Sequence, residues 1–290
     1  MNDRVRGMTL VAGAAVVWST GGLLARLIES SDSWTTIFWR SASAFAFLLA
    51  FIAITSGRNA PRLFREMGWP GLVVGFCFAC ASISLVVALS LTSVAKTLVI
   101  MSATPLIAAV FGRVFLGEPI RPATYATIAA VMAGIAVMVS GAETEGSLRG
   151  DFFALLIAIA YGGAIVTSRR YPHIGMMPAA CSGAGIAMVI SFLFAAPLSA
   201  TGHDLPIMFL FGAGQLGVGL ALFVTGVRLI PAAHSALLAM FEPILGPIWV
   251  WLALGEKPAT TVLIGGAIVI ASVAAKTMFD VRQRPELPAA

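Results

Sequence analysis

The chain has 290 residues, of which 59% are hydrophobic and 11% are charged, and its mean hydropathy is +0.96. This composition excludes an ordinary soluble domain and predicts an integral membrane protein, because apolar runs recur at the length that crosses a bilayer. Membrane topology and contact with anionic lipid explain the formal net charge of +5, so we expect no nucleic-acid partner.

Ten apolar runs predict ten transmembrane helices that use almost the whole chain. The predicted spans are about 7–27, 36–56, 69–90, 94–116, 122–140, 150–169, 178–197, 206–228, 233–254 and 259–279, with ends good to ~2–4 residues. The first run exceeds the ~7–15 apolar residues of a signal peptide, so we expect a retained helix.

The Lys and Arg residues predict how these spans are oriented. If the N-terminus is cytoplasmic, all but five of the 18 Lys and Arg residues belong to inside segments. The five expected outside are Arg26, Arg40, Lys96, Arg149 and Lys257. We therefore expect both termini in the cytoplasm.

Two segments of similar sequence indicate an internal repeat. Residues 105–118 (PLIAAVFGRVFLGE) and 243–256 (PILGPIWVWLALGE) lie 138 positions apart. Five predicted spans separate them, so the second copy crosses the membrane in the opposite direction. Inverted repeats of this kind are typical of secondary transporters, whose binding site lies between the halves.

A polar segment marks the junction of the two halves, and beyond it the pattern of the first span starts again. With an offset of 143, residues 15–26 align with 158–169, and Trp18 aligns with Tyr161. We predict an all-α membrane protein of two inverted five-helix repeats around a central cavity. The predicted parts are a first repeat (1–140), a loop (141–149), a second repeat (150–279) and a short cytoplasmic tail (280–290).

These features resemble the EamA-like branch of the drug/metabolite transporter superfamily. The resemblance rests on the five-plus-five arrangement, Trp18-Ser19 in the first span and the twin segments ending in Leu-Gly-Glu, and it extends from Gly7 to about Phe279. Within the superfamily, the chain is most similar to ten-helix bacterial amino-acid exporters, including the aromatic type. The resemblance implies a transporter, usually an exporter, of small metabolites across the bacterial inner membrane.

Three prolines are predicted to break membrane helices. Pro105 and Pro243 lie near the centres of the fourth and ninth spans and should free the carbonyl groups of Met101 and Ala239. Pro247 adds a second defect, so we expect the ninth span to be the more broken. Freed backbone groups can bind a ligand. The alternative is a kink that only serves helix packing.

Glu242 is the strongest single candidate for a substrate-binding residue. It lies about halfway along the ninth span, where an ionised carboxylate costs ~2.5–3.5 kcal/mol. Intramembrane carboxylates usually have a function, so we expect Glu242 to bind a substrate amine or a proton. The alternative is a hydrogen-bonded carboxyl group that ties helices together.

Five further residues are predicted to line the substrate site. Gln215 lies in a glycine-rich span that either leaves room for a ligand or allows close helix packing. Trp18 and Tyr161 could form two aromatic walls of one cavity, or be core aromatics. Ser102 and Thr104 could line the same space, or bond to the backbone instead.

Other conspicuous residues are expected to have structural roles. Glu118 and Glu256 end their spans at the water boundary and should shape the turn to the next helix. Lys96 and His234, which also match across the repeat, are expected at the membrane interface. Trp249 is expected to be a belt or packing residue.

Enzyme activity is not expected. The chain has no H-E-x-x-H or G-x-S-x-G motif, and Cys77 and Cys80 have no second pair nearby to complete a zinc site. We therefore predict neither a metal nor a cofactor. A membrane sensor or an intramembrane enzyme is a less favoured alternative.

The substrate class can be narrowed by the sign of its charge. The predicted interior offers a carboxylate and lacks the basic groups that a phosphorylated substrate needs, so an amine-bearing substrate fits better. We predict export of amino acids by alternating access, with efflux of cationic drugs or quaternary amines as the alternative. Whether protons are a coupling partner is left open.

Overall fold

The structure is a computed structural model that describes residues 3–29, 32–117, 122–140, 147–172, 175–230, 235, 238–239 and 241–283. These residues are almost all helical, and no β-strand occurs among them. The predicted all-α class is confirmed.

The described helices form ten spans at the predicted positions. They are α1 (Asp3–Ser19) with α2 (Gly21–Arg26), α3 (Ser33–Ser56), α5 (Gly68–Leu91), α6 (Val94–Met101) with α7 (Thr104–Leu116), α8 (Pro122–Ser140), α9 (Leu148–Arg170), α10 (Met176–Phe192), α11 (Asp204–Phe209) with the π-helix η3 (Leu210–Val218) and α12 (Gly219–Val227), α14 (Phe241–Leu254) and α15 (Thr260–Gln283). Six of the spans are long and apolar enough to cross a membrane on those grounds alone, and the other four contain shorter apolar helices.

Three short helices lie outside the spans. They are η1 (Gly57–Asn59), α4 (Ala60–Glu66) and η2 (Pro197–Ser199). Helix α4 lies between the second and third predicted spans, where no helix was predicted. Pro61 in its first turn favours this start, because no intrahelical hydrogen bond is needed from the backbone nitrogen at that position.

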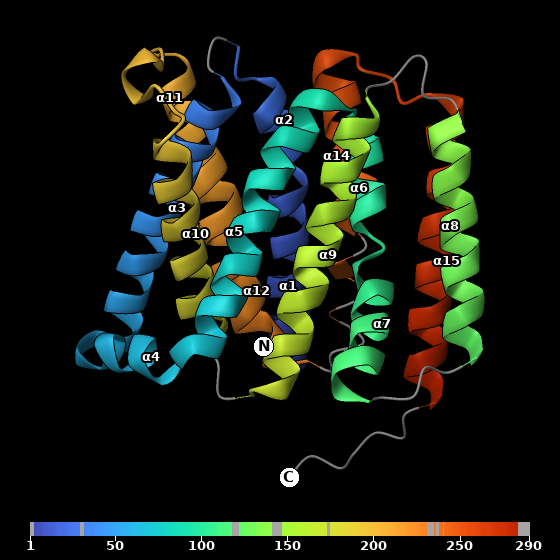
Figure 1. Cartoon of the computed structure of the whole chain (residues 1–290), viewed down its shortest axis with the longest axis horizontal. Coiled ribbons are helices and arrows are strands. Elements are labelled where there is room, and N and C mark those ends of the chain that lie inside the picture. Colours follow the sequence, from blue (N-terminus) through green and yellow to red (C-terminus); the bar gives the residue numbers. More distant parts are fainter. Residues whose placement is uncertain are drawn as a thin grey trace.

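Successive spans run in opposite directions through one helical bundle (Figure 1). Helix α1 begins, and α15 ends, at the same end of the bundle, which we call the terminal face. The other end is the distal face. Helix α1 runs from the terminal to the distal face, whereas its repeat mate α9 runs the opposite way. The two repeats are therefore inverted, as predicted.

The contacts between helices follow the same symmetry. Helix α1 packs on α12 and α14 of the second half, and its mate α9 packs on α5 and α7 of the first half. Helix α3 packs on its own mate α10, and α8 packs on its own mate α15. Because the central helices pack mainly across the repeat boundary, neither half encloses the middle of the bundle by itself.

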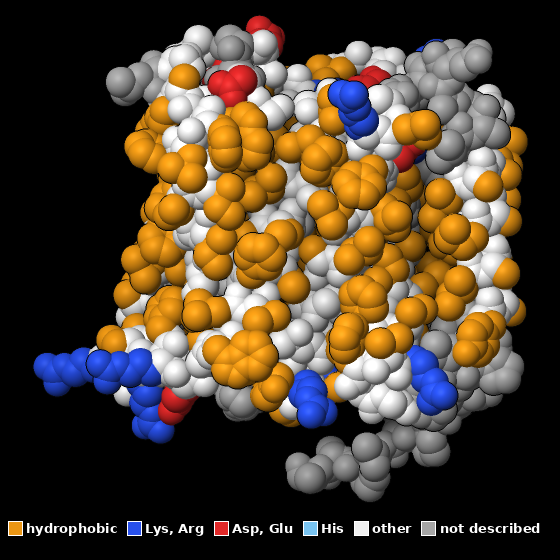
Figure 2. All heavy atoms as spheres, viewed as in Figure 1, with side chains coloured by type: hydrophobic (Ala, Val, Ile, Leu, Met, Phe, Trp, Pro, Cys, Tyr) orange, Lys and Arg blue, Asp and Glu red, His pale blue; other side chains and the backbone are white. Residues whose placement is uncertain are grey.

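The outer surface is suited to lipid. Figure 2 shows hydrophobic side chains over the middle of the visible face, with charged side chains gathered at its two ends. Large apolar side chains such as Ile54, Leu193 and Leu252 are 71–84% exposed, an arrangement that is unfavourable in water but stable in a bilayer.

The two Leu-Gly-Glu segments end their helices in the same way. Gly117 and Gly255 have φ angles of 70° and 71°, in the left-handed region that glycine adopts without a steric penalty. The amide of Gly255 donates to the carbonyl of Trp251 at 2.9 Å. The expected helix C-termini are confirmed.

Cysteine labelling can test the inverted topology in membranes. In a variant without native cysteines, we expect a cysteine at Lys257 to react only from outside, because this residue follows α14 at the distal face. A cysteine in residues 118–121, which lie outside the described part of the chain, should react only from the cytoplasm. Labelling of both from the same side would contradict the repeat.

Candidate functional site

Three spans are interrupted near the middle of the bundle. The first span breaks at Thr20, between α1 and α2, and the fourth breaks between α6 and α7. The eighth span contains the π-helix η3, a rare conformation that often marks functional sites. Interrupted membrane helices expose backbone groups only where protein or a ligand can satisfy them.

The break in the fourth span has the predicted position. Pro105 stands in the first turn of α7, and the Met101 carbonyl accepts a hydrogen bond from the Thr104 hydroxyl at 2.7 Å. The Ser102 hydroxyl donates to the Val99 carbonyl at 2.6 Å. Both hydroxyls therefore bond to the backbone, which is the alternative weighed for them, and contact of either residue with substrate stays a prediction.

The second break expected in the ninth span is wrong. Helix α14 runs without interruption from Phe241 to Leu254, through Pro243 and Pro247. Only the single hydrogen bond from position 247 is lost, and packing against α1 holds the helix in place. Pro243 was also predicted to free the carbonyl group of Ala239, and the region around Ala239 lies partly outside the described residues.

The packing of α14 on α1 decides between the two roles expected for Trp249. Its ring nitrogen donates to the buried Ser19 hydroxyl at 2.9 Å, so the side chain faces α1 and is not part of an interfacial belt. One turn earlier, a side chain at Gly246 would overlap the end of the Leu98 side chain, so α14 also packs closely on α6 at this position.

Arg40 is the largest departure from the sequence prediction. It was expected outside, but its side chain lies inside the bundle, where the residue is 2% exposed. Its guanidinium lies over the Phe211 ring, 4.4 Å from the ring centre. It donates to the Ser82 hydroxyl, and its Nη2 atom lies 3.5 Å from the side-chain amide oxygen of Gln215. The interior therefore contains a cation.

Gln215 joins Arg40 to the broken first span. Its side-chain nitrogen donates to the Trp18 carbonyl at 3.0 Å, next to the break at Thr20. A Cβ atom at Gly21 would lie 2.8 Å from that nitrogen. The absence of a side chain at Gly21 therefore leaves room for the Gln215 side chain. Gln215 is buried, and its contact with substrate stays a prediction.

Tyr161 and Glu242 complete the group. The Tyr161 side chain interacts electrostatically with both Arg40 and Glu242. No hydrogen bond or ion pair joins the Glu242 carboxyl group to any residue that the structure describes. We call Arg40, Ser82, Tyr161, Gln215 and Glu242 the polar core.

The polar core draws on both repeats. Its residues come from α3 and α5 of the first half and from α9, η3 and α14 of the second. At 1.5 Å per helical residue, Arg40 lies about 10 Å along α3 from the distal face. Glu242 lies about 18 Å along α14 from the same face. The polar core is thus a mid-membrane group with a cation nearer the distal face and a carboxyl group deeper.

The two predicted aromatic walls pack separately in this structure. The Trp18 ring lies 5.2 Å from that of Phe223, and Gly219 makes room for its indole. The Tyr161 ring lies 6.0 Å from that of Phe78. Only Tyr161 belongs to the polar core, and a shared cavity between Trp18 and Tyr161 stays a prediction.

A buried ion pair lies on the distal side of the polar core. The Lys96 ammonium is 2.9 Å from the Asp151 carboxylate, with 0% and 10% of the side chains exposed. Asp151 also accepts from the Thr92 hydroxyl at 3.3 Å. The interfacial role expected for Lys96 is therefore wrong, because α6 and α9 pack around it. Its predicted match His234 lies outside the described residues.

A second ion pair joins the distal ends of three spans. Arg26, at the end of α2, contacts both carboxylate oxygens of Glu256, at 3.0 and 3.2 Å. It also donates to the carbonyls of Leu89 and Thr92, where α5 ends. Glu256 therefore does more than shape the turn expected of it, since it bonds the two repeats together. Glu118 lies outside the described residues.

Comparison with known proteins gives the family. The model of the EamA-like transporter family matches the chain twice, over residues 5–140 and 148–277. The chain belongs to the EamA-like transporter family. The predicted resemblance to the EamA-like branch is confirmed, and the protein is a multi-pass membrane transporter of the drug/metabolite type.

A solved structure supports the fold of this transporter. A crystal structure of a protein aligns over 96% of this chain and 99% of its own, with 19% sequence identity and a TM-score of 0.69. At this identity the similarity shows the fold alone. The chain matched no curated protein.

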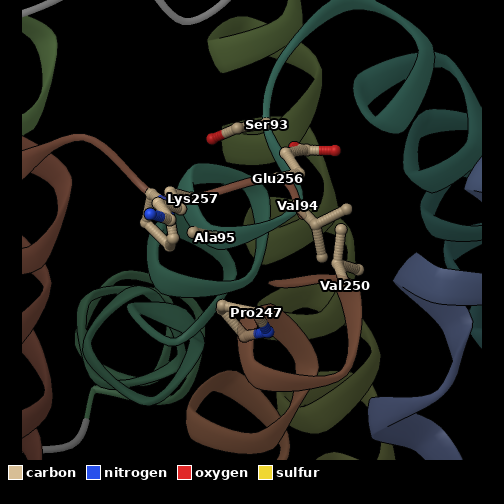
Figure 3. Close-up of a pocket in the computed structure, with 8 residues that line it drawn as sticks. Ser93, Val94, Ala95, Pro247, Val250, Glu256 and Lys257 are labelled. Carbon is tan, nitrogen blue, oxygen red and sulfur yellow. The ribbon is translucent and has the colours of Figure 1, made fainter. Parts of the chain in front are cut away.

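A small pocket adjoins the Arg26–Glu256 pair. Figure 3 shows it at the start of α6 and the distal part of α14, with Glu256 on its edge. It is lined by Ser93, Val94, Ala95, Pro247, Val250, Glu256, Lys257 and Pro258. Its enclosed space is about that of one water molecule, too small for a metabolite. The distal end is thus nearly closed here, and a central substrate cavity stays a prediction.

Breaking the Arg26–Glu256 pair should loosen this closed end. In a variant with Val250→Cys as its single cysteine, we expect Arg26→Ala to raise the rate of labelling from outside by about three- to fivefold. The effect is modest because a partly exposed pair contributes under about 1 kcal/mol. Glu66→Gln, which breaks the exposed Arg62–Glu66 pair, is the control and should change nothing. An unchanged rate in Arg26→Ala would show that the pair does not hold this end closed.

Proposed function

We propose that this transporter exports small amine-bearing metabolites, foremost amino acids, across the bacterial inner membrane by alternating access. The proposal rests mainly on the position and surroundings of the Glu242 carboxyl group. Its carboxyl group lies about 18 Å along α14 from the distal face, on a partly exposed residue, and has no hydrogen-bonding partner among the described residues. A substrate amine would supply both the charge and the hydrogen bonds that this group lacks.

The arrangement of the two repeats supports alternating access. The polar core combines residues of both halves, and the distal ends are joined by the Arg26–Glu256 and Lys96–Asp151 pairs. A rocking motion of one half against the other would open one face while closing the other around a fixed site. We assign the terminal face to the cytoplasm, because the predicted inside segments carry most of the Lys and Arg residues.

The alternative substrate is a cationic drug or a quaternary amine. Such a molecule would use Glu242 in the same way, and the aromatic rings of Tyr161 and Phe78 could receive its cationic head. It would have no use for Arg40. The presence of a cation in the polar core therefore favours amino acids.

Counterflow in proteoliposomes tests the proposed function. Vesicles that contain the purified protein and a high internal concentration of one amino acid should take up the same labelled amino acid from outside. A panel of amino acids and quaternary amines would separate the two substrate classes. Detergent should abolish the accumulation, since transport needs a sealed membrane. If nothing in the panel accumulates above protein-free vesicles, the proposed function is wrong.

A further inference from the structure

We propose that Arg40 binds the carboxylate of a zwitterionic substrate whose amine lies at Glu242. The inference rests on the proposed function and narrows its substrate class to molecules that carry both an amine and a carboxylate.

Arg40 is a buried cation without an acidic partner among the residues that the structure describes. Buried charges in proteins are normally paired, because desolvation is otherwise too costly. Within the described residues, no carboxylate lies within ion-pair distance of the guanidinium, and its Nε atom has no hydrogen-bond partner. The Gln215 oxygen, at 3.5 Å, is a marginal acceptor.

The Lys96–Asp151 pair provides an internal comparison. Lys96 is the other fully buried cation of the described chain, and it has its acid at 2.9 Å. The fold therefore can place a carboxylate beside a buried cation. At Arg40 it places a hydroxyl, an amide and an aromatic ring instead, all of them neutral.

These neutral groups orient the guanidinium but do not use all of its N–H donors. The Arg40 Cζ atom lies over the Phe211 ring, and the Ser82 hydroxyl accepts from Nη1. A guanidinium has five N–H donors in a fixed fork that matches a carboxylate in a two-point contact. A ring that holds the plane in place reduces the entropy lost when such a contact forms.

Arg40 and Glu242 lie at different depths of the polar core, about 8 Å apart along the helix axes. Arg40 is the nearer of the two to the distal face. A bound amino acid would therefore point its carboxylate toward the distal face and its amine toward the middle of the membrane, with Gln215 beside it.

This arrangement predicts strong selection for the carboxylate. A simple amine or an amino acid amide would leave Arg40 desolvated and unpaired, as it is without substrate. An amino acid would pair it. Charge-assisted hydrogen bonds of this kind correspond to about 10- to 100-fold in affinity.

Calorimetric titration of the detergent-solubilised protein tests the inference. The probes are L-phenylalanine and L-phenylalaninamide, with L-alanine and L-alaninamide as a second pair. We expect each acid to bind at least about tenfold more tightly than its amide. Arg40→Gln should remove this difference by weakening the acid alone, whereas Arg40→Lys, which keeps the charge, should restore part of it. Arg149→Gln, at an exposed cation of α9, is the matched control and should behave as wild type.

The outcomes separate the inference from the proposed function. Equal binding of acid and amide by the wild type, or equal weakening of both in a folded Arg40→Gln variant, overturns the role of Arg40 while amine transport stands. If Arg40→Gln does not fold, the wild-type comparison of acid with amide still decides. Absence of binding by both probe pairs, together with absence of amino-acid counterflow, overturns the proposed function itself.

Discussion

Replacement of Glu242 by glutamine is expected to give a folded protein that binds amine substrates about 10- to 100-fold more weakly. Glutamine keeps the shape and the hydrogen-bonding capacity of the side chain but removes its charge, so an ammonium group loses a charge-assisted contact. Counterflow of the best amino acid by purified wild type and variant measures the loss. Glu66→Gln, on the exposed helix α4, is the control.

The same variant should abolish the dependence of transport on pH. Protonation of Glu242 removes the charge that attracts the amine, so proton and substrate should compete and wild-type binding should weaken as pH falls. Among the described residues, the group that interacts electrostatically with this carboxyl is Tyr161, and a phenol ordinarily titrates well above pH 8. Normal transport by Glu242→Gln with an unchanged pH profile would make the carboxyl group structural. The amine and coupling hypotheses would then fall together.

Loss of one partner of the Lys96–Asp151 pair should have the largest effect on stability. Lys96→Met leaves a buried carboxylate without its cation, and Asp151→Asn leaves a buried ammonium without its anion. Removing one partner of a buried pair typically costs about 3–5 kcal/mol. We expect both single variants to unfold at clearly lower denaturant or temperature in detergent.

The double variant tells pairing apart from general damage. Replacement of both residues, as Lys96→Met with Asp151→Leu, removes both charges at once and should recover most of the lost stability. Arg149→Gln, two residues before Asp151 and exposed, should have no effect. A double variant less stable than either single variant would show that packing, and not charge, dominates at this position.

The spans and their inversion were predictable from the sequence because each has a strong local signal. A membrane helix needs a long apolar run, and the repeated Pro and Leu-Gly-Glu positions relate one half to the other. The left-handed Gly117 and Gly255 follow from the same motif. Helix α4 had no such signal, because a short amphipathic helix beside a membrane resembles a polar loop.

The buried cations were misplaced because the orientation rule counts charges by their distance from span ends. Helix α3 begins at Ser33, three residues before the predicted start, so Arg40 lies two turns inside the bundle. Lys96 lies close to the start of its span, but α9 covers it and supplies Asp151. Burial by a helix from the other repeat depends on tertiary packing, and a hydropathy profile carries no information about such packing.

In the candidate site, too, single residues could be predicted from the sequence, whereas the contacts between them could not. Glu242 and Gln215 were found because a charge or an amide in an apolar span is conspicuous. The contacts that unite Gln215 with Arg40 and Ser82 could not be found, since they join the second, third and eighth spans. The π-helix η3 also has no sequence signal beyond the glycines of its span.

Protection of the polar core by substrate tests the central claim most directly. Ser82→Cys, in a background without Cys77, Cys80 and Cys181, places a single thiol beside Arg40. We predict that the amino acid that supports counterflow slows thiol labelling at this position, with half-protection at the concentration that half-saturates transport. A cysteine at the exposed Ser90 of α5 should show no protection. Undiminished labelling of Ser82→Cys at a concentration that saturates transport would contradict the claim that substrate binds in the polar core.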